Sequence, residues 1–336
     1  MFSTRRKTKR RYRLSNQVHR INKLPIIIIF ILCVTLLFSG YHLSKYYFDF
    51  MNLQKNNTEL KEIYYQDEAL ESDIVIHSDY DVSEEIEYDK ERDIHVLLRE
   101  SAQVFSNDNS IETKKANFLP VKTYPLNPHL LIFNRFKRLR DKNKDIIGWL
   151  SVDELLEQAV VQRNNTYYLN RDAYGKKNEN GALFLDEECD LTVRPYTLII
   201  YGHNMKSGEM FGSLRKYEKV SFYKSHPFLT FDSMYEDGKY VVFAVSRINA
   251  IQKGNRYVNI RKLSAFSIQD RMKGIDQLMM YSTIKTPLDI QPEDQLLLLV
   301  TCGSNENERL VVAARRVRDQ EDVKDIDKYV QLAYAR

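Results

Sequence analysis

The sequence is poor in cysteine, and its three cysteines lie far apart. They are Cys33, Cys189 and Cys302 in a chain of 336 residues. None belongs to a CxxC pair or to a Cys/His cluster with the spacing of a zinc site. We therefore expect no metal site and no cofactor. A Cys189–Cys302 disulfide stays open as an alternative, although it would consume the thiol best placed for chemistry.

Acidic residues are missing from the first 23 positions, where nine lysines and arginines occur. The net charge of +4 comes from this block, because the rest of the chain has more acidic than basic residues. A uniformly basic surface, as expected of a nucleic-acid-binding protein, is therefore excluded. We expect no nucleic-acid partner.

Charged residues are also missing between Leu24 and Leu43, a mostly apolar stretch. About twenty apolar residues cross a lipid bilayer as a helix. The basic tail, residues 1–23, should stay in the cytoplasm, which places the rest of the chain outside the cell. A cleavable signal peptide is the alternative, but the run is long for one and no clear A-x-A-like site follows. Aromatic residues typical of a membrane interface occur at and after its end: Tyr41, Tyr46, Tyr47 and Phe48.

Residues 44–120 lack a regular apolar pattern, and acidic residues outnumber basic ones between Glu59 and Glu100. This composition predicts an acidic extracellular stalk, partly helical or disordered, that the chemistry does not need. A cation-binding role for the acidic run is the alternative. From residue 121 to residue 336 the composition is that of a globular domain.

The globular part lacks both internal repeats and the alternation of strands and helices that builds parallel α/β folds. Helices are predicted over Asn127–Asn143 and after Ser267, which is expected to cap a helix with one apolar face. Short β-type runs predominate: Gln158–Gln162, Ala182–Leu185, Thr197–Tyr201, Tyr240–Arg247, Gln295–Thr301 and Arg309–Val317. The pattern predicts a mostly β fold, a closed or nearly closed barrel with peripheral helices.

Three reactive side chains lie at the ends of apolar runs. Cys302 ends the run Leu296–Thr301, His203 ends a similar run, and Arg309 opens a third one seven residues after the cysteine. Side chains at strand ends are held rigidly and can still face a cleft. A thiol beside an imidazolium or a guanidinium can ionise near neutral pH, and an arginine can donate hydrogen bonds to an oxyanion. Cys302 and Arg309 flank one short loop, so we expect them to be neighbours across a hairpin.

Each residue alone has a simpler interpretation. A lone histidine is usually a surface or satisfied core residue, a free cysteine is often a small buried hydrophobe, and an arginine beside a loop is usually a surface charge. The combination at three strand ends favours a catalytic site over these interpretations.

In these segments the sequence resembles class B sortases. The segment Thr197–Met205, followed by Met210–Leu214, resembles the histidine motif of the family, and Thr301–Cys302 and Arg309–Ala313 resemble its cysteine and arginine strands. Further segments match the early strands in order: Asn143–Leu150, Val160–Gln162, Tyr167–Asn170 and Gly181–Asp186. The predicted helix Ser267–Tyr281 is similar to the extra helix that distinguishes class B.

The resemblance implies a cysteine transpeptidase with a sortase-type β-barrel as its catalytic domain, residues 121–336. Such enzymes cleave a C-terminal sorting motif of a secreted protein after threonine and hold the threonyl group as a thioester. An amine, usually of peptidoglycan, then accepts the protein. The implied partners are thus sorting-motif proteins, a peptidoglycan amine and membrane lipid around residues 24–43, on the outer face of a Gram-positive-type plasma membrane.

The resemblance also implies roles for single residues. Cys302 is then the nucleophile, His203 the general acid and later the base, and Arg309 the group that supports the oxyanion or orients the motif. Asn165, Tyr201 and Tyr257 match family positions that line the substrate groove. The sequence departs from the family pattern without losing any of the three catalytic side chains, but the preferred sorting motif is left open. The departures are Val300 before Thr301, Gly303 after the cysteine, and Gln158-Ala159-Val160-Val161.

Two other functions stay open. Another cysteine enzyme is the first, although papain-like enzymes place cysteine before histidine in the chain, and L,D-transpeptidases have a Ser-x-Gly-Cys type signature that this sequence lacks. A membrane-anchored surface scaffold without catalysis is the second.

Overall fold

The computed structural model describes residues 24–75, 117–153, 155–252, 255–302 and 307–336, and it leaves the side chains of residues 25–26, 67–75 and 302 undescribed. The chain forms two compact units, one ending at Phe48 and one beginning at Asp49. The predicted basic tail and most of the acidic run lie outside the described residues.

The first unit contains the apolar beginning of helix α1 (Leu24–Val75). Its apolar side chains are exposed, from Leu24 through Phe48. By length and composition this helix can cross a membrane. The predicted anchor, residues 24–43, lies within it.

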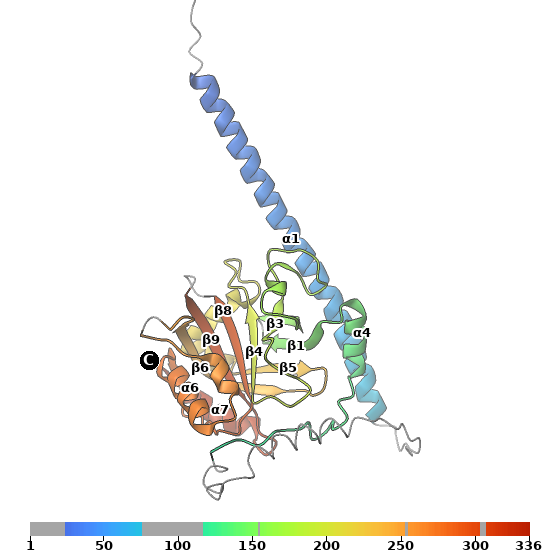
Figure 1. The fold of residues 1–336 in the computed structure, drawn as a ribbon, viewed down its shortest axis with the longest axis vertical. Coiled ribbons are helices and arrows are strands. Elements are labelled where there is room, and N and C mark those ends of the chain that lie inside the picture. Colours follow the sequence, from blue (N-terminus) through green and yellow to red (C-terminus); the bar gives the residue numbers. More distant parts are fainter. Residues whose placement is uncertain (1–23, 76–116, 154, 253–254, 303–306) are drawn as a thin grey trace, which may run out of the picture. The chain divides into compact units, whose positions relative to one another are not determined.

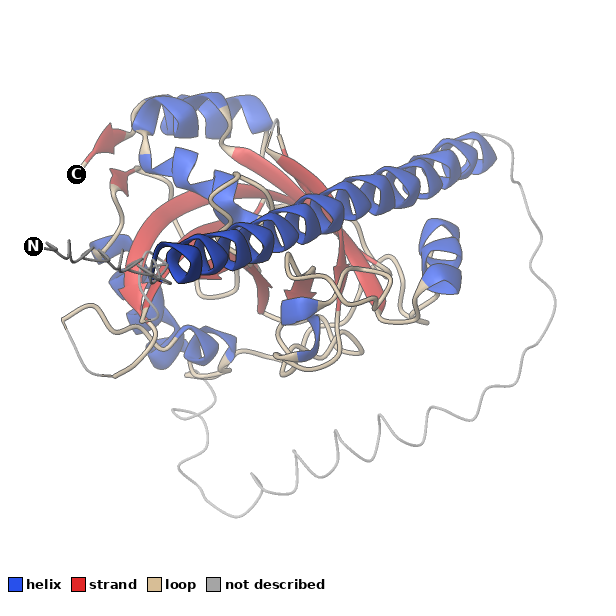
Figure 2. Ribbon diagram, turned by 90° about the horizontal axis from the view of Figure 1, so that it is seen from above, coloured by secondary structure: helices blue, strands red, loops and turns tan. Residues whose placement is uncertain are grey.

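The second unit is built around a closed β-barrel, as the sequence predicts (Figure 1). The order of strands around the barrel is β1-β2-β3-β4-β8-β9-β6-β5, and Figure 2 shows them curving around a common core. Their bounds are β1 (Ile146–Val152), β2 (Leu156–Val161), β3 (Leu183–Leu185), β4 (Thr197–Gly202), β5 (Phe228–Ser233), β6 (Lys239–Asn249), β8 (Leu296–Cys302) and β9 (Glu308–Arg316).

Strands β4 and β8 pair in parallel, and β8 and β9 pair antiparallel. The run Leu296–Val300 in β8 is buried throughout. A continuous apolar run of this kind is typical of a strand covered on both faces, whereas a strand with one wet face alternates. This pairing fixes which residues leave the barrel at the same edge.

Short helices surround the barrel. Ser267 precedes helix α6 (Ile268–Met280), and its side chain accepts a hydrogen bond from the Asp270 amide, so the predicted cap is confirmed. The helix predicted over Asn127–Asn143 is shorter than expected. The remaining elements are α4 (Asn134–Lys142), α5 (Val220–Ser225), α7 (Val323–Gln331), the 3-10 helices η1 (Tyr167–Asn170), η2 (Phe211–Glu218) and η3 (Ile260–Ser264), and a small sheet of β7 (Ile284–Lys285) and β10 (Tyr334–Ala335).

The late start of α4 has a local cause. The Asn127 side chain accepts a hydrogen bond from the Leu131 amide at 2.8 Å and donates one to the Leu131 carbonyl at 2.8 Å. Leu130, between them, has a φ of 53°. Such side-chain bonds to the backbone compete with helix formation, so the helix begins only at Asn134.

A buried arginine attaches α6 to the barrel. Arg271 is fully buried. It donates to Pro292 O at 2.8 Å, to Thr197 Oγ1 at 2.7 Å and to Tyr196 O at 3.0 Å, and also to the carbonyls of Leu263 and Asp294. Burial lowers the pKa of Arg271 to about 10, which still leaves it charged at neutral pH. The guanidinium thereby ties the helix to the beginning of β4.

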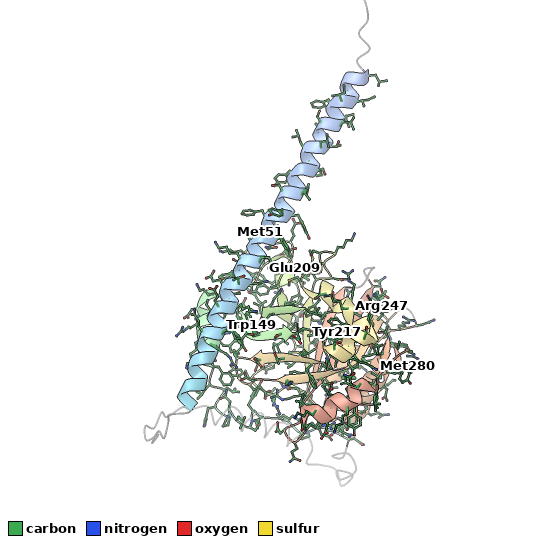
Figure 3. The ribbon with its side chains drawn as sticks, turned by 180° about the vertical axis from the view of Figure 1, so that it is seen from behind. Met51, Trp149, Glu209, Tyr217, Arg247 and Met280 are labelled. Carbon is green, nitrogen blue, oxygen red and sulfur yellow. The ribbon has the colours of Figure 1, made fainter. Side chains whose placement is uncertain are left out.

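Residues 49–66 of α1 pack against the barrel. Leu53, Leu60 and Tyr64 are buried in its core clusters. The Tyr64 ring stacks on Trp149 with ring centroids 4.7 Å apart, and its hydroxyl donates to Asp232 Oδ2 at 2.5 Å; Figure 3 shows Trp149 against this helix. The predicted domain boundary near residue 120 stays a prediction. A solvated stalk would not make these contacts with the barrel, so they were not expected from the sequence.

Candidate active site

The strand register brings the predicted cysteine and histidine positions to one edge of the barrel. Gly202 at the end of β4 pairs in parallel with Thr301 near the end of β8. His203 and Cys302 are the next residues along their two strands, so their backbones leave the barrel side by side. Residues almost a hundred positions apart in the chain are neighbours here because parallel strands end at the same edge.

Arg309 lies across from the cysteine. Cys302 and Arg309 are direct partners in the antiparallel β8–β9 register. The Arg309 guanidinium is partly exposed and donates to Glu308 O at 2.9 Å through Nη1. The hairpin relation expected from the sequence is therefore present, and all three candidate catalytic positions lie at one edge.

The His203 ring is held by a backbone carbonyl. Its Nε2 lies 2.6 Å from Leu169 O, in η1. A carbonyl oxygen can only accept, so Nε2 must carry the hydrogen in this contact. In a neutral ring Nδ1 then carries no hydrogen.

A cavity of about 260 Å³ lies beside Arg309. Tyr201 and Tyr257, both predicted from the resemblance to contact substrate, line it, together with Ile248, Ala250, Val258, Asn259, Ile260, Arg261 and Val300. Asn165, the third predicted substrate residue, is not among these lining residues. The cavity is shaped by apolar and aromatic side chains with a few polar groups, as is common for ligand sites.

Asn165 joins this cavity indirectly through Asp186. The Tyr201 hydroxyl donates to Asp186 Oδ2 at 2.8 Å, and the Asn165 amide lies 3.4 Å from the same oxygen. Arg261 Nε lies 3.2 Å from it as well, while the Asp186 side chain is only 1% exposed. Burial, and then the Asp186 charge, raise the pKa of Tyr201, so the phenol stays protonated and keeps donating.

Cys189 is unsuited to nucleophilic chemistry. It is a buried free thiol whose Sγ lies 3.6 Å from Thr197 O. Burial raises its pKa to about 12, so the thiolate is scarce at neutral pH. Because Cys189 is free, the alternative Cys189–Cys302 disulfide is wrong for this structure.

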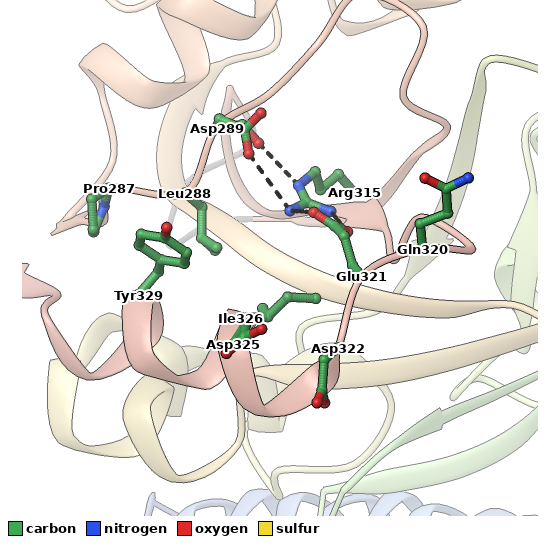
Figure 4. A pocket seen from close by; sticks show the side chains of 10 residues that line it. All are labelled: Pro287, Leu288, Asp289, Arg315, Gln320, Glu321, Asp322, Asp325, Ile326 and Tyr329. Carbon is green, nitrogen blue, oxygen red and sulfur yellow. Dashed lines mark hydrogen bonds and ion pairs between the residues drawn. The ribbon is translucent and has the colours of Figure 1, made fainter.

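A second cavity, of about 430 Å³, lies at the other end of β9, and its lining includes an ion-paired arginine as well as apolar residues (Figure 4). Arg315, 1% exposed, donates to both carboxylate oxygens of Glu321 at 2.7 and 2.8 Å and to Asp289 O at 3.0 Å. None of its lining residues is a cysteine or a histidine. We assign this cavity a structural role.

Comparison with known proteins identifies the family. A model of the sortase domain matches residues 150–317, half of the chain. The chain belongs to the sortase family. It is 30% identical over 189 residues to sortase B of Staphylococcus aureus, covering 55% of this chain and 75% of that protein. It is 27% identical over 189 residues to sortase B of Listeria monocytogenes, covering 55% and 74%.

Solved sortase structures share the fold. A crystal structure from Bacillus anthracis, described as similar to sortase B, has a TM-score of 0.51 and 27% identity, covering 70% of this chain and all of that one. The S. aureus sortase B–substrate complex has a TM-score of 0.51 and 29% identity, covering 56% and 87%. The resemblance to class B is thereby confirmed, including the closed barrel and the extra helix before the cysteine strand. As a sortase, the chain is a member of a transpeptidase family that acts at the cell surface.

Three groups near the site were not predicted to act there. Asp186 ends a segment already matched to the family, but nothing in its sequence context indicated a buried carboxylate. Nothing in the sequence around Arg261 distinguishes it from a surface arginine. The Leu169 carbonyl belongs to the backbone, so the type of side chain at this position does not predict its contact with His203. Their partners come from distant segments, so only the folded chain shows them.

Proposed function

We propose that this sortase is a membrane-anchored class B cysteine transpeptidase. It cleaves the C-terminal sorting motif of secreted proteins after threonine and transfers them to an amine of peptidoglycan. The observation that carries the proposal is the register of β4, β8 and β9, which brings positions 203, 302 and 309 to one edge.

The first half-reaction forms a thioester. The Cys302 thiol gives its proton to His203 Nδ1, the resulting thiolate attacks the threonyl carbonyl carbon, and the electron pair of the C=O bond moves to oxygen. As the tetrahedral intermediate collapses, the C–N bond breaks and the leaving amine takes a proton from His203 Nδ1. The hydrogen atom on Nε2 remains hydrogen-bonded to Leu169 O throughout, so the ring keeps its orientation.

The second half-reaction reverses these roles. An incoming amine attacks the thioester carbonyl while His203 Nδ1 accepts its proton. The C–S bond breaks, an amide forms, and Cys302 leaves as a thiolate that takes the proton from His203 Nδ1. Water in place of the amine would give hydrolysis, so the acceptor decides whether the enzyme joins or only cuts.

Arg309 supports the negative charge on the former carbonyl oxygen or holds a carbonyl of the motif. Its planar guanidinium presents fixed donors to an oxygen atom. Tyr201 and Tyr257 line the cavity beside it and would contact the motif, while Asn165 supports Tyr201 through Asp186.

The anchor fits this function. The apolar part of α1, residues 24–43, would span the plasma membrane, with the basic tail in the cytoplasm and the barrel outside. In that orientation the enzyme meets secreted proteins and peptidoglycan on the same side.

The test uses the full-length protein in detergent, a library of sorting peptides and an added amine, with products identified by mass spectrometry. We expect cleavage after threonine and a new amide to the amine, both absent in Cys302→Ala. Hydrolysis alone at every amine concentration would identify a cysteine peptidase. Absence of any reaction, together with no selective labelling of Cys302 by a thiol-reactive peptide, would support the scaffold. Either outcome overturns the proposal.

A further inference from the structure

Two segments lie beside His203: residues 167–181 and the loop that follows His203 in the chain. Both contact residues 49–66 of helix α1. We propose that residues 49–66 of α1 position the catalytic histidine, with Asn56 and Asn178 as positioning residues. This inference rests on the proposed function, since it assigns a purpose to the orientation of His203.

The first contact in this chain is between His203 and residues 167–181. Leu169 O accepts from His203 Nε2 at 2.6 Å. Gly181, with a φ of +66°, packs closely against the same place. A Cβ atom at Gly181 would lie 2.7 Å from Tyr168 O, 2.9 Å from Leu169 O and 3.2 Å from His203 Cδ2. The carbonyl and the ring are therefore fixed by the path of this loop.

The loop is organised by Asp172. This carboxylate is 3% exposed, and its Oδ1 accepts from the amides of Tyr174 at 3.0 Å and Lys176 at 2.9 Å. Its Oδ2 accepts from Asn56 Nδ2, on α1, at 2.8 Å. Burial raises the pKa of Asp172, and the hydrogen bonds work against that rise. One oxygen thus folds the loop and the other holds it to the helix.

Asn178 makes a second attachment. It is 2% exposed, and its Nδ2 donates to Asp49 O on α1 at 2.9 Å. Its backbone amide donates to Asn170 O at 3.0 Å, next to Leu169 in the chain. The helix is therefore joined by two hydrogen bonds to the segment that carries the Leu169 carbonyl.

The helix also approaches the loop that follows His203. Glu209 has a raised pKa because it is partly buried, and a hydrogen bond with Gln54 of α1 opposes this rise. Figure 3 labels Glu209 close to this part of the helix. Both segments that border the histidine thus contact the same stretch of α1.

If this inference holds, removing one hydrogen bond between α1 and the loop should change the orientation of the His203 ring while the protein stays folded. Asn56→Ala removes one donor from a half-buried position and leaves the buried Leu53, Leu60 and Tyr64 in place. Lys61→Ala is the matched control, because Lys61 lies on the same helix but pairs with Glu157 of β2 instead of the loop. Asn56→Gln keeps an amide donor, so its His203 tautomer and its kcat should lie between those of Asn56→Ala and the wild type.

The experiment compares these variants in the full-length protein, labelled with ¹⁵N-histidine. At a pH at which the ring is neutral, we expect NMR to show His203 of the wild type as a single tautomer protonated at Nε2, with the signal assigned from His203→Gln. Asn56→Ala should show mixed tautomers, and its kcat should fall about tenfold or more, as misplacement of a catalytic group does, with KM little changed. Lys61→Ala should match the wild type in both measurements.

Equal spectra and equal kcat values for Asn56→Ala and Lys61→Ala would overturn the inference, as would a wild-type ring protonated at Nδ1 alone. The tautomer measurement needs no turnover. If no variant cleaves any sorting peptide, the proposed function fails, and the spectra still decide whether the helix orients His203.

Discussion

The two ends of the parallel pair β4–β8 use polar side chains for opposite purposes. At the carboxyl end, His203 and Cys302 leave the barrel next to Arg309, beside a cavity. At the amino end, Arg271 is fully buried, and each nitrogen of its guanidinium donates a hydrogen bond to a neighbouring carbonyl or hydroxyl.

The difference separates stability from chemistry. Removing a buried cation whose hydrogen-bond donors are all paired strongly lowers the stability of the fold, and such a cation has no donor left for a substrate. A partly exposed guanidinium at a cavity wall can change partners when a ligand binds. We therefore expect variants at the carboxyl end to lose activity but keep the fold, and variants at the amino end to do the reverse.

Cys302→Ala tests the carboxyl end with the largest expected effect. Thioester formation needs the sulfur, so cleavage and transfer should fall to background. A thiol at a strand end contributes little packing, so thermal unfolding should stay close to that of the wild type. Residual turnover on sorting peptides, or a collapse of the melting temperature, would mean that the residue is structural.

His203→Ala should come next. Without a positioned acid, the leaving amine departs unprotonated, and loss of such a group typically costs about 10²–10⁴-fold in kcat. Steady-state kinetics with a sorting peptide would measure this. His226, which accepts no proton in the proposed mechanism, provides the control in His226→Ala. A His203 variant within a few-fold of the wild type would remove it from the mechanism.

Arg309→Lys should be almost as damaging as Arg309→Ala. A lysine keeps the charge but cannot reproduce the planar pair of donors. Loss of one donor to an oxyanion typically lowers kcat about 10²–10³-fold. The comparison of kcat/KM for the two variants decides the point. A near-normal rate with lysine would show that charge alone suffices.

Arg271→Met tests the amino end, where the expected effect on chemistry is smallest. The substitution leaves several buried carbonyls without a donor, which should lower the free energy of unfolding by about 3 kcal/mol or more. Denaturant titration would measure this loss. The kcat per folded molecule, at a temperature where the variant stays folded, should remain within a few-fold of the wild type. A large fall in kcat with normal stability would break the comparison between the two ends.

The sequence predicted the carboxyl end well for physical reasons. Continuous apolar runs identify β4 and β8, and the short polar loop after Cys302 identifies the hairpin to β9. It missed β5, although Leu229 and Phe231 alternate with Thr230 and Asp232 as in a strand with one buried face, because the segment is short and directly follows Pro227.

The amino end and the α1 contacts could not be predicted in the same way. A charged residue such as Arg271 in a helix is normally expected at the surface, and the carbonyls that bury it come from segments far apart in the chain. Leu53, Leu60 and Tyr64 recur on one face of α1 but stand among polar residues, so the segment was predicted to be part of an acidic stalk, partly helical or disordered. Cys189 was seen as a second thiol, and only its burial, which raises the pKa of the thiol, argues against a nucleophilic role.

The account depends most on Cys302 being the residue that carries the acyl group. The direct measurement is mass spectrometry of peptides from full-length enzyme quenched in acid during turnover of a sorting peptide. We predict a thioester adduct, ending at the threonyl carbonyl, on the peptide that contains Cys302 and none on the peptide that contains Cys189. An adduct on Cys189, or cleavage without any adduct on Cys302, would contradict the account.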